Sequence, residues 1–109
     1  MMLYVVVGAF MIMDILTGFA GAIKKKTVNS TVFRDGMYKK VGSVAIVLFG
    51  TLVDYCQTMV DIGFSVNCSL TFSIAIIVME SISILENIGE LNPDLVKIIQ
   101  PYLEKISNK

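Results

Sequence analysis

Long apolar runs on either side of one strongly basic stretch restrict the fold of this chain more than any other feature of its sequence. The basic stretch, Lys24 to Lys40, holds six of the nine Lys and Arg residues and a single acid, Asp35. Loops rich in Lys and Arg stay on the cytoplasmic side of a membrane when they join two hydrophobic helices. The pattern therefore predicts a membrane protein and also predicts which end of its helices faces the cytoplasm.

The apolar runs are long enough to cross a bilayer, which takes about 20 helical residues. They cover Leu3–Ile23, Val41–Val60 and Val66–Leu85. We predict an all-α membrane protein of a single domain, residues 1–109, with three transmembrane helices. These helices are expected at about 3–23, 41–60 and 66–87. Two crossings are the alternative, because Glu80 interrupts the third run; a soluble bundle is disfavoured, because the runs are apolar nearly all round.

The composition excludes several classes of function. The chain is 55% hydrophobic and 17% charged, whereas soluble domains are about 25% charged. The formal net charge is zero, so no overall field attracts nucleic acid, and no nucleic-acid partner is expected. The absence of His removes the commonest general base and metal ligand, and Cys56 and Cys68 lack zinc-site spacing. We therefore predict no enzyme activity, no metal and no cofactor, and we expect free thiols, with a Cys56–Cys68 disulfide as the alternative.

Charge asymmetry between the loops predicts the orientation. The connector around Asp61 has no basic residue, whereas the C-terminal tail carries Lys97, Lys105 and Lys109. The N-terminus is therefore expected outside and the C-terminus inside. The basic residues of the first loop are expected to fix this topology and to bind anionic lipid. They are Lys24, Lys25, Lys26, Arg34, Lys39 and Lys40.

The tail has a helical pattern of its own. We expect Gly89 to end the third helix, and Asn92-Pro93 to serve as N-cap and first position of a new amphipathic helix at about 93–106. Pro101 is expected to kink this helix or end it early. Its apolar face is expected to lie on the membrane surface or to pack against partner helices. That face contains Leu95, Ile98, Ile99, Tyr102, Leu103 and Ile106.

Each apolar run is interrupted by one acid: Asp14, Asp54 and Glu80. A charge near the middle of a membrane helix costs about 3 kcal/mol on insertion scales. No Lys or Arg lies within an apolar run to pair with these acids. We therefore expect them to be protonated, hydrogen-bonded to neutral groups or facing water, and we expect one protomer to be unable to satisfy them alone.

Each acid also shares a helical face with small or polar residues, at spacings of three, four and seven. Two interpretations stay open for these faces: close contact and hydrogen bonding between helices, or a water-lined path built by several copies. The candidate pore-lining or assembly residues are Asp14, Thr17, Asp54, Gln57, Glu80 and Ser83. The candidate helix-packing residues are Gly18, Gly21 and Gly50.

Several blocks of the sequence occur in an order that is similar to a known family. They are Met13 to Gly18 (MDILTG), the Lys run, Asn29-Ser30, Asp35 to Lys40 (DGMYKK), Glu80 to Asn87 (ESISILEN), and Gly89-Glu90-Leu91 followed by Pro93. Together they resemble the phage lysis and toxin-secretion holins, which include the clostridial toxin-release proteins.

The resemblance implies a small protein of the bacterial cytoplasmic membrane that homo-oligomerises. Such proteins open lesions through which a murein hydrolase or a toxin crosses the membrane. The implied partners are further copies of the chain, the lipid bilayer and an antiholin. Two alternatives fit the residues alone: a proton- or ion-conducting membrane subunit, and a non-pore adaptor that binds a partner through its amphipathic tail.

Overall fold

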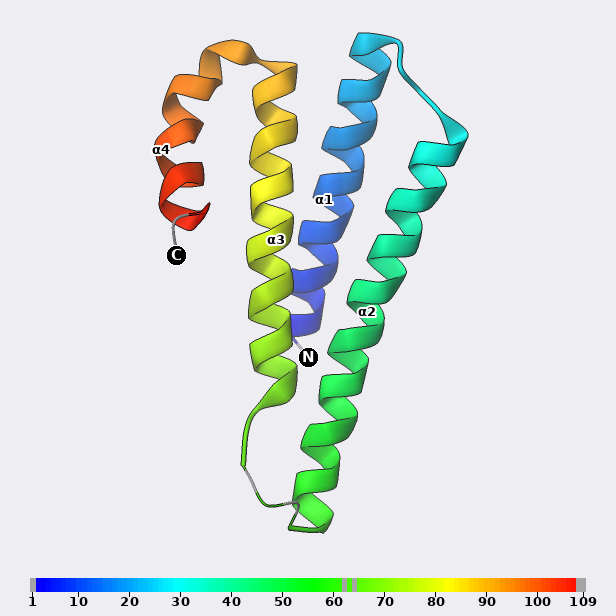
Figure 1. Ribbon diagram of the computed structural model, residues 1–109, viewed down its shortest axis with the longest axis vertical. Coiled ribbons are helices and arrows are strands. Elements are labelled where there is room, and N and C mark those ends of the chain that lie inside the picture. The colour runs from blue at the N-terminus through cyan, green and yellow to red at the C-terminus, as the bar shows by residue number, and fades with distance from the viewer. Residues whose placement is uncertain (1, 62, 64, 108–109) are drawn as a thin grey trace.

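The computed structural model is an all-helical bundle whose long helices run side by side (Figure 1). It describes residues 2–61, 63 and 65–107. Within these residues the elements are α1 (Met2–Lys25), α2 (Ser30–Met59), α3 (Cys68–Leu91), the 3-10 helix η1 (Pro93–Leu95) and α4 (Val96–Ser107). Helices α1, α2 and α3 are each long and apolar enough to cross a membrane. The predicted all-α architecture with three spanning helices is confirmed.

Helix α2 begins at Ser30, well before the predicted start near residue 41. Asn29 caps it: its Oδ1 accepts hydrogen bonds from Thr31 N at 2.8 Å and Val32 N at 3.3 Å. The prediction was wrong because it followed hydropathy alone, whereas an N-cap starts a helix whether or not its first turns are apolar. At 1.5 Å per residue the helix is roughly 45 Å long, and it exceeds the ~30 Å hydrocarbon core.

The basic connector is correspondingly short. Helix α1 ends at Lys25, and Lys26 follows with a φ of 57°, the left-handed conformation that commonly ends helices. We call this side of the bundle the basic end. It is where α1 ends, α2 begins and α3 ends. The opposite side, where α2 joins α3, is called the loop end.

Helix α3 continues through Gly89 to Leu91, so the prediction that Gly89 ends it was wrong. Lys24 explains part of this extension, because its Nζ donates to the carbonyl oxygens of Glu90 at 3.2 Å and Leu91 at 3.0 Å. These late carbonyls have no partner inside the helix, and a cation at a helix C-terminus satisfies them.

The predicted Asn92-Pro93 helix start is confirmed. Asn92 accepts from Asp94 N at 3.2 Å, and Pro93 opens η1. Helix α4 then runs back alongside α3 (Figure 1) and passes through Pro101 to Ser107, so it does not end early. On its predicted apolar face Ile98 and Tyr102 are exposed, whereas the side chains at Ile99, Leu103 and Ile106 lie outside the described residues.

Helix α3 holds the bundle together, because it packs closely against both α1 and α2, whereas the backbones of α1 and α2 come close at few points and these two helices meet mainly through side chains. The apolar core lies toward the loop end and consists of Val7, Met11, Val47 and Ile76. Gly50 is buried there, and a Cβ at this position would come within 2.7 Å of Phe72 Cδ2. The absent side chain thus lets α2 approach α3 closely.

Candidate functional site

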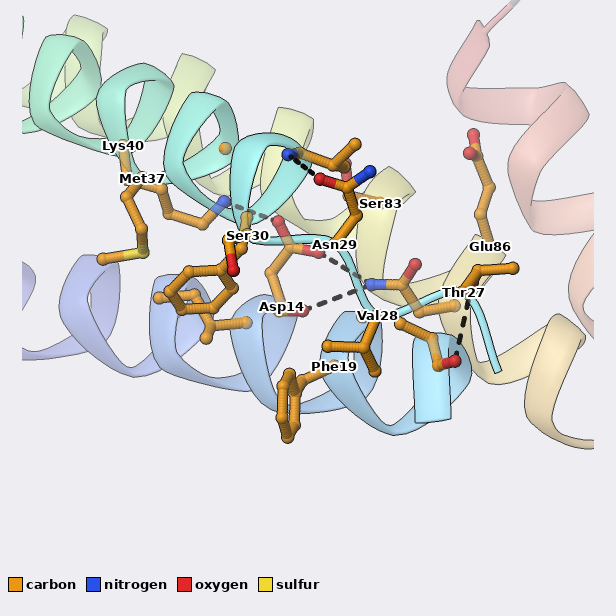
Figure 2. Close-up of a pocket in the computed structure, with 17 residues that line it drawn as sticks. Asp14, Phe19, Thr27, Val28, Asn29, Ser30, Met37, Lys40, Ser83 and Glu86 are labelled. Atoms are coloured by element: carbon orange, nitrogen blue, oxygen red, sulfur yellow. Dashed lines mark hydrogen bonds and ion pairs between the residues drawn. The ribbon is translucent and has the colours of Figure 1, made fainter. Parts of the chain in front are cut away.

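The described residues include a cluster of ionisable side chains from three different helices. Lys40 Nζ of α2 donates to Asp14 Oδ2 of α1 at 2.6 Å, and to Glu80 Oε1 and Oε2 of α3 at 3.2 and 3.0 Å. The Lys40, Asp14 and Glu80 side chains are only 17%, 13% and 9% exposed. We call these residues the ion triad. Figure 2 shows Asp14 and Lys40 reaching toward each other from α1 and α2.

The ion triad lies far from both ends of the bundle. Each of its residues is about ten positions from the basic end of its own helix, or roughly 16 Å at 1.5 Å per residue. Since the hydrocarbon core of a bilayer is about 30 Å thick and the apolar run of α2 begins directly after Lys40, the triad lies within the bundle toward the basic side of its membrane-spanning part. An isolated charge there is costly, and pairing is how membrane proteins retain such residues.

Two sequence-based expectations about these acids are therefore wrong. Asp14 and Glu80 do have a basic partner, and one protomer satisfies them without a second copy. The error has one cause, because Lys40 was assigned to a loop, as a topology and lipid anchor, whereas α2 already includes it. A detectable signal existed: Lys40 precedes Val47 by seven positions and Val47 precedes Asp54 by seven, so all three share one helical face.

Asn87 joins the ion triad from α3. Its Nδ2 donates to Asp14 Oδ1 at 2.9 Å and lies 3.1 Å from Thr17 Oγ1. Thr17 in turn donates to the Met13 carbonyl oxygen at 2.8 Å. The amide packs directly against Gly18, where a Cβ would lie 3.4 Å from Asn87 Nδ2. The polar face of α1 is thus a contact surface for α3 within one protomer.

Gly21 and the neighbouring lysines complete this contact at the basic end. Gly21 is buried, and a Cβ there would lie 3.7 Å from Glu90 Oε2. Lys25 Nζ pairs with Glu90 Oε1 at 3.0 Å in an exposed position, where an ion pair contributes little. Lys26, Arg34 and Lys39 are exposed.

Asp54 and Gln57 lie away from the ion triad, at the loop end. Asp54 accepts from the backbone nitrogens of Cys68 at 2.6 Å and Ser69 at 2.9 Å, so it caps the N-terminus of α3. Gln57 donates to the Val66 carbonyl at 2.7 Å and accepts from Val66 N at 2.8 Å. These contacts fix the connector between α2 and α3, and the pore-lining or assembly role of both side chains stays a prediction.

A cavity of about 530 Å³ adjoins the ion triad on its basic side. Asp14, Lys40, Ser83 and Asn87 contribute polar groups to its wall, and the loop residues Thr27 to Ser30 line it toward the basic end (Figure 2). Apolar side chains of α1 and α2 complete the lining. They include Phe19 and Phe33, whose rings meet edge to face at 6.3 Å between centroids.

The described residues contain no group of three or more His, Cys, Asp or Glu side chains placed to hold a metal ion. Both cysteines are free: Cys56 is exposed and Cys68 is half-buried. The polar side chains available at the level of the ion triad are therefore an amine, two carboxyl groups, an amide and hydroxyls. Such groups can hold helices together or hydrate, depending on whether they face each other or water.

Comparison with known proteins gives one family. The family model described as the bacteriophage holin family matches residues 1–108. No curated protein and no solved structure matches the chain. Since the match extends over nearly the whole sequence and the chain has three helices able to span a membrane, this is a membrane protein that belongs to the bacteriophage holin family.

Proposed function

We propose that this holin homo-oligomerises in the bacterial cytoplasmic membrane and opens lesions that release a murein hydrolase or a toxin. Membership of the family supports a role in lysis. The observation that carries the finer proposal is the ion triad inside the bundle, whose three side chains meet within one protomer. A protomer that turns these side chains toward one another can accumulate dispersed in lipid, because it does not present them to the surrounding hydrocarbon.

The same triad supplies the groups that a wet lesion needs. The backbones of α1 and α2 come close at few points, and Lys40 is a main polar link from α2 to the other two helices at the level of the ion triad. Separation of α2 would expose Asp14, Lys40 and Glu80 together. In hydrocarbon this exposure is prohibitive, but in a water-filled lumen each ion regains its hydration. Copies that surround a common lumen can therefore open where a lone protomer stays closed.

We infer that the basic end faces the cytoplasm, with the N-terminus outside and the C-terminus inside. Support comes from the basic residues around the short α1–α2 connector and from the lack of any in the connector at the loop end. Cysteine labelling from outside should reach a probe at Gly63 and miss one at Asn29; the reverse pattern would contradict this orientation. An antiholin partner stays a prediction.

The test of function is controlled expression with two readouts, a potential-sensitive dye and the release of a cytosolic enzyme. A holin should release the enzyme abruptly after a period of silent accumulation, and crosslinking at that time should give species larger than a dimer. Loss of potential without enzyme release would instead indicate an ion-conducting subunit. A protein that stays monomeric at high membrane density would contradict the homo-oligomer.

A further inference from the structure

We propose that the cavity beside the ion triad is a water-filled vestibule, open at the basic end and sealed toward the loop end. It would bring water from one side of the membrane to Asp14 and Lys40 before any lesion forms. The inference depends on the insertion into the cytoplasmic membrane and on the orientation proposed above, but not on oligomerisation or lysis.

The position of the cavity supports access from one side only. Its lining comes from α1 at and after Asp14, from the loop, from the first part of α2 up to Lys40, and from α3 at and after Ser83. All of these segments lie between the ion triad and the basic end. The loop residues Thr27 to Ser30, which line the outer part of the cavity, are exposed, so the cavity reaches the level of the aqueous interface.

The seal toward the loop end is the apolar core. Val7 and Met11 precede Asp14 in α1, Val47 follows Lys40 in α2, and Ile76 precedes Glu80 in α3. All four are therefore on the loop side of the triad, and they are 4–7% exposed. Close packing of apolar side chains leaves no room or partner for water.

Water is the occupant that the polar groups at the inner end of the cavity favour. A buried water needs space and two to four polar partners. The cavity offers Asp14, Lys40, Ser83 and Asn87 deep inside and Asn29 near its mouth. A lipid chain in the same space would place hydrocarbon against a carboxylate and an ammonium, which is unfavourable.

The charge of the ion triad points the same way. The Lys40 amine is shared by the carboxyl groups of Asp14 and Glu80, so each acid has only part of a cation. A carboxyl group with a shared cation is far less costly beside water than in hydrocarbon. The vestibule thus explains how both acids are retained inside the bundle, and it makes the triad accessible to small hydrophilic solutes from the basic end.

The test is thiol labelling in a full-length background in which Cys56 and Cys68 are replaced by Ala. Ser83→Cys, nearly isosteric, reports on the cavity. Leu16→Cys is the matched control, because positions 16 and 83 both lie roughly 12–14 Å from the basic end of their helices at 1.5 Å per residue. Leu16 differs in being 63% exposed on the outer surface of the bundle, and it does not line the cavity. A small membrane-impermeant methanethiosulfonate reagent is applied before lysis, to inverted vesicles and to intact cells separately.

Ser83→Cys should react at least roughly tenfold faster than Leu16→Cys in inverted vesicles, because the thiolate that reacts forms beside water and not in hydrocarbon. It should be unreactive in intact cells. Val47→Cys, within the seal, should be unreactive from both sides. Gly36→Cys, on the cavity wall with open space for its Cβ, gives the same measurement if Ser83→Cys fails to accumulate.

Equal rates for Ser83→Cys and Leu16→Cys would overturn the vestibule, as would reaction of Val47→Cys at the rate of Ser83→Cys. Quenching of a Phe33→Trp variant by lipids brominated on their chains, together with an unreactive Ser83→Cys, would show a lipid-filled groove and also overturn it. Lysis by the same variants is scored separately, so a failed vestibule with normal lysis leaves the proposed function standing.

Discussion

The two halves of this bundle hold their helices together through opposite kinds of contact. In the half toward the basic end, helices meet through charges and amides around a cavity, with Lys40 between Asp14 and Glu80. In the half toward the loop end, they meet through a dry core and through Gly50, where α2 packs directly against Phe72 and the backbone of Cys68. One half can gain from hydration, and the other cannot.

The difference indicates where a lesion would begin. Polar contacts exchange protein partners for water at modest net cost, whereas separating a packed apolar core exposes surface with no compensation from water. We therefore expect opening to start in the half that contains the ion triad. The predictions below test this contrast, from the largest effect to the smallest.

Lys40→Met should be the most damaging substitution. It leaves two buried carboxylates without their cation, and breaking a buried pair in this way costs about 3–5 kcal/mol. The loss should appear as a lower midpoint of denaturant unfolding of the purified protein in detergent, followed by helical circular dichroism. Lys39→Met, at an exposed neighbouring position, is the control and should change little.

A second variant separates charge from packing in the same half. Asp14→Asn/Lys40→Met/Glu80→Gln removes every charge of the ion triad and should recover most of the stability, since a neutral cluster can be as stable as a buried ion pair. If Lys40→Met and Lys39→Met have the same unfolding midpoint, the ion triad contributes nothing measurable to stability and the contrast between the halves fails.

Gly50→Ala should disrupt the other half. The added Cβ would lie 2.7 Å from Phe72 Cδ2 and 3.0 Å from the backbone carbon of Cys68, and overpacking of this kind costs about 1–3 kcal/mol. Gly42→Ala is the matched control in the same helix, because a Cβ there meets nothing within 4 Å. It should be neutral or stabilising by roughly 0.5–1 kcal/mol, as Ala is the better helix former. Equal midpoints for both variants would show that the α2–α3 approach is loose.

Asp54→Ala should cause a smaller loss, confined to the connector at the loop end. It removes the acceptor for the backbone nitrogens of Cys68 and Ser69, whereas Asp54→Asn keeps an oxygen able to cap. Amide hydrogen exchange should therefore rise at the start of α3 in the Ala variant and hardly change in the Asn variant. Slower lysis for both variants, with amide hydrogen exchange unchanged, would instead support a pore-lining role for Asp54.

Much of this architecture could be predicted from the sequence, but the ion triad could not. The spans near 3–23 and 66–87 and the Asn92-Pro93 helix start follow from hydropathy and capping. The pairing of Lys40 could not be predicted in this way, because it depends on where α2 begins. Hydropathy alone assigns the polar first turns of α2 to a loop. The three acids looked equivalent, yet only tertiary packing decides that Asp14 and Glu80 meet while Asp54 caps α3.

Tyr4→Phe should give the smallest effect, and it tests the link between α1 and α2 on the loop side of the ion triad. Tyr4 Oη and Thr51 Oγ1 are 2.6 Å apart. Thr51 already donates to the Val47 carbonyl at 3.0 Å, so Tyr4 is the donor of this bond. Hydrogen bonds between membrane helices average about 0.6 kcal/mol in double-mutant cycles. Tyr4→Phe and Thr51→Ala, measured singly and together, should give a coupling of that size while lysis timing stays unchanged. A coupling near that of the Lys40 contacts would mean that polar links hold α2 to α1 along its whole length, and opening would then have no preferred end.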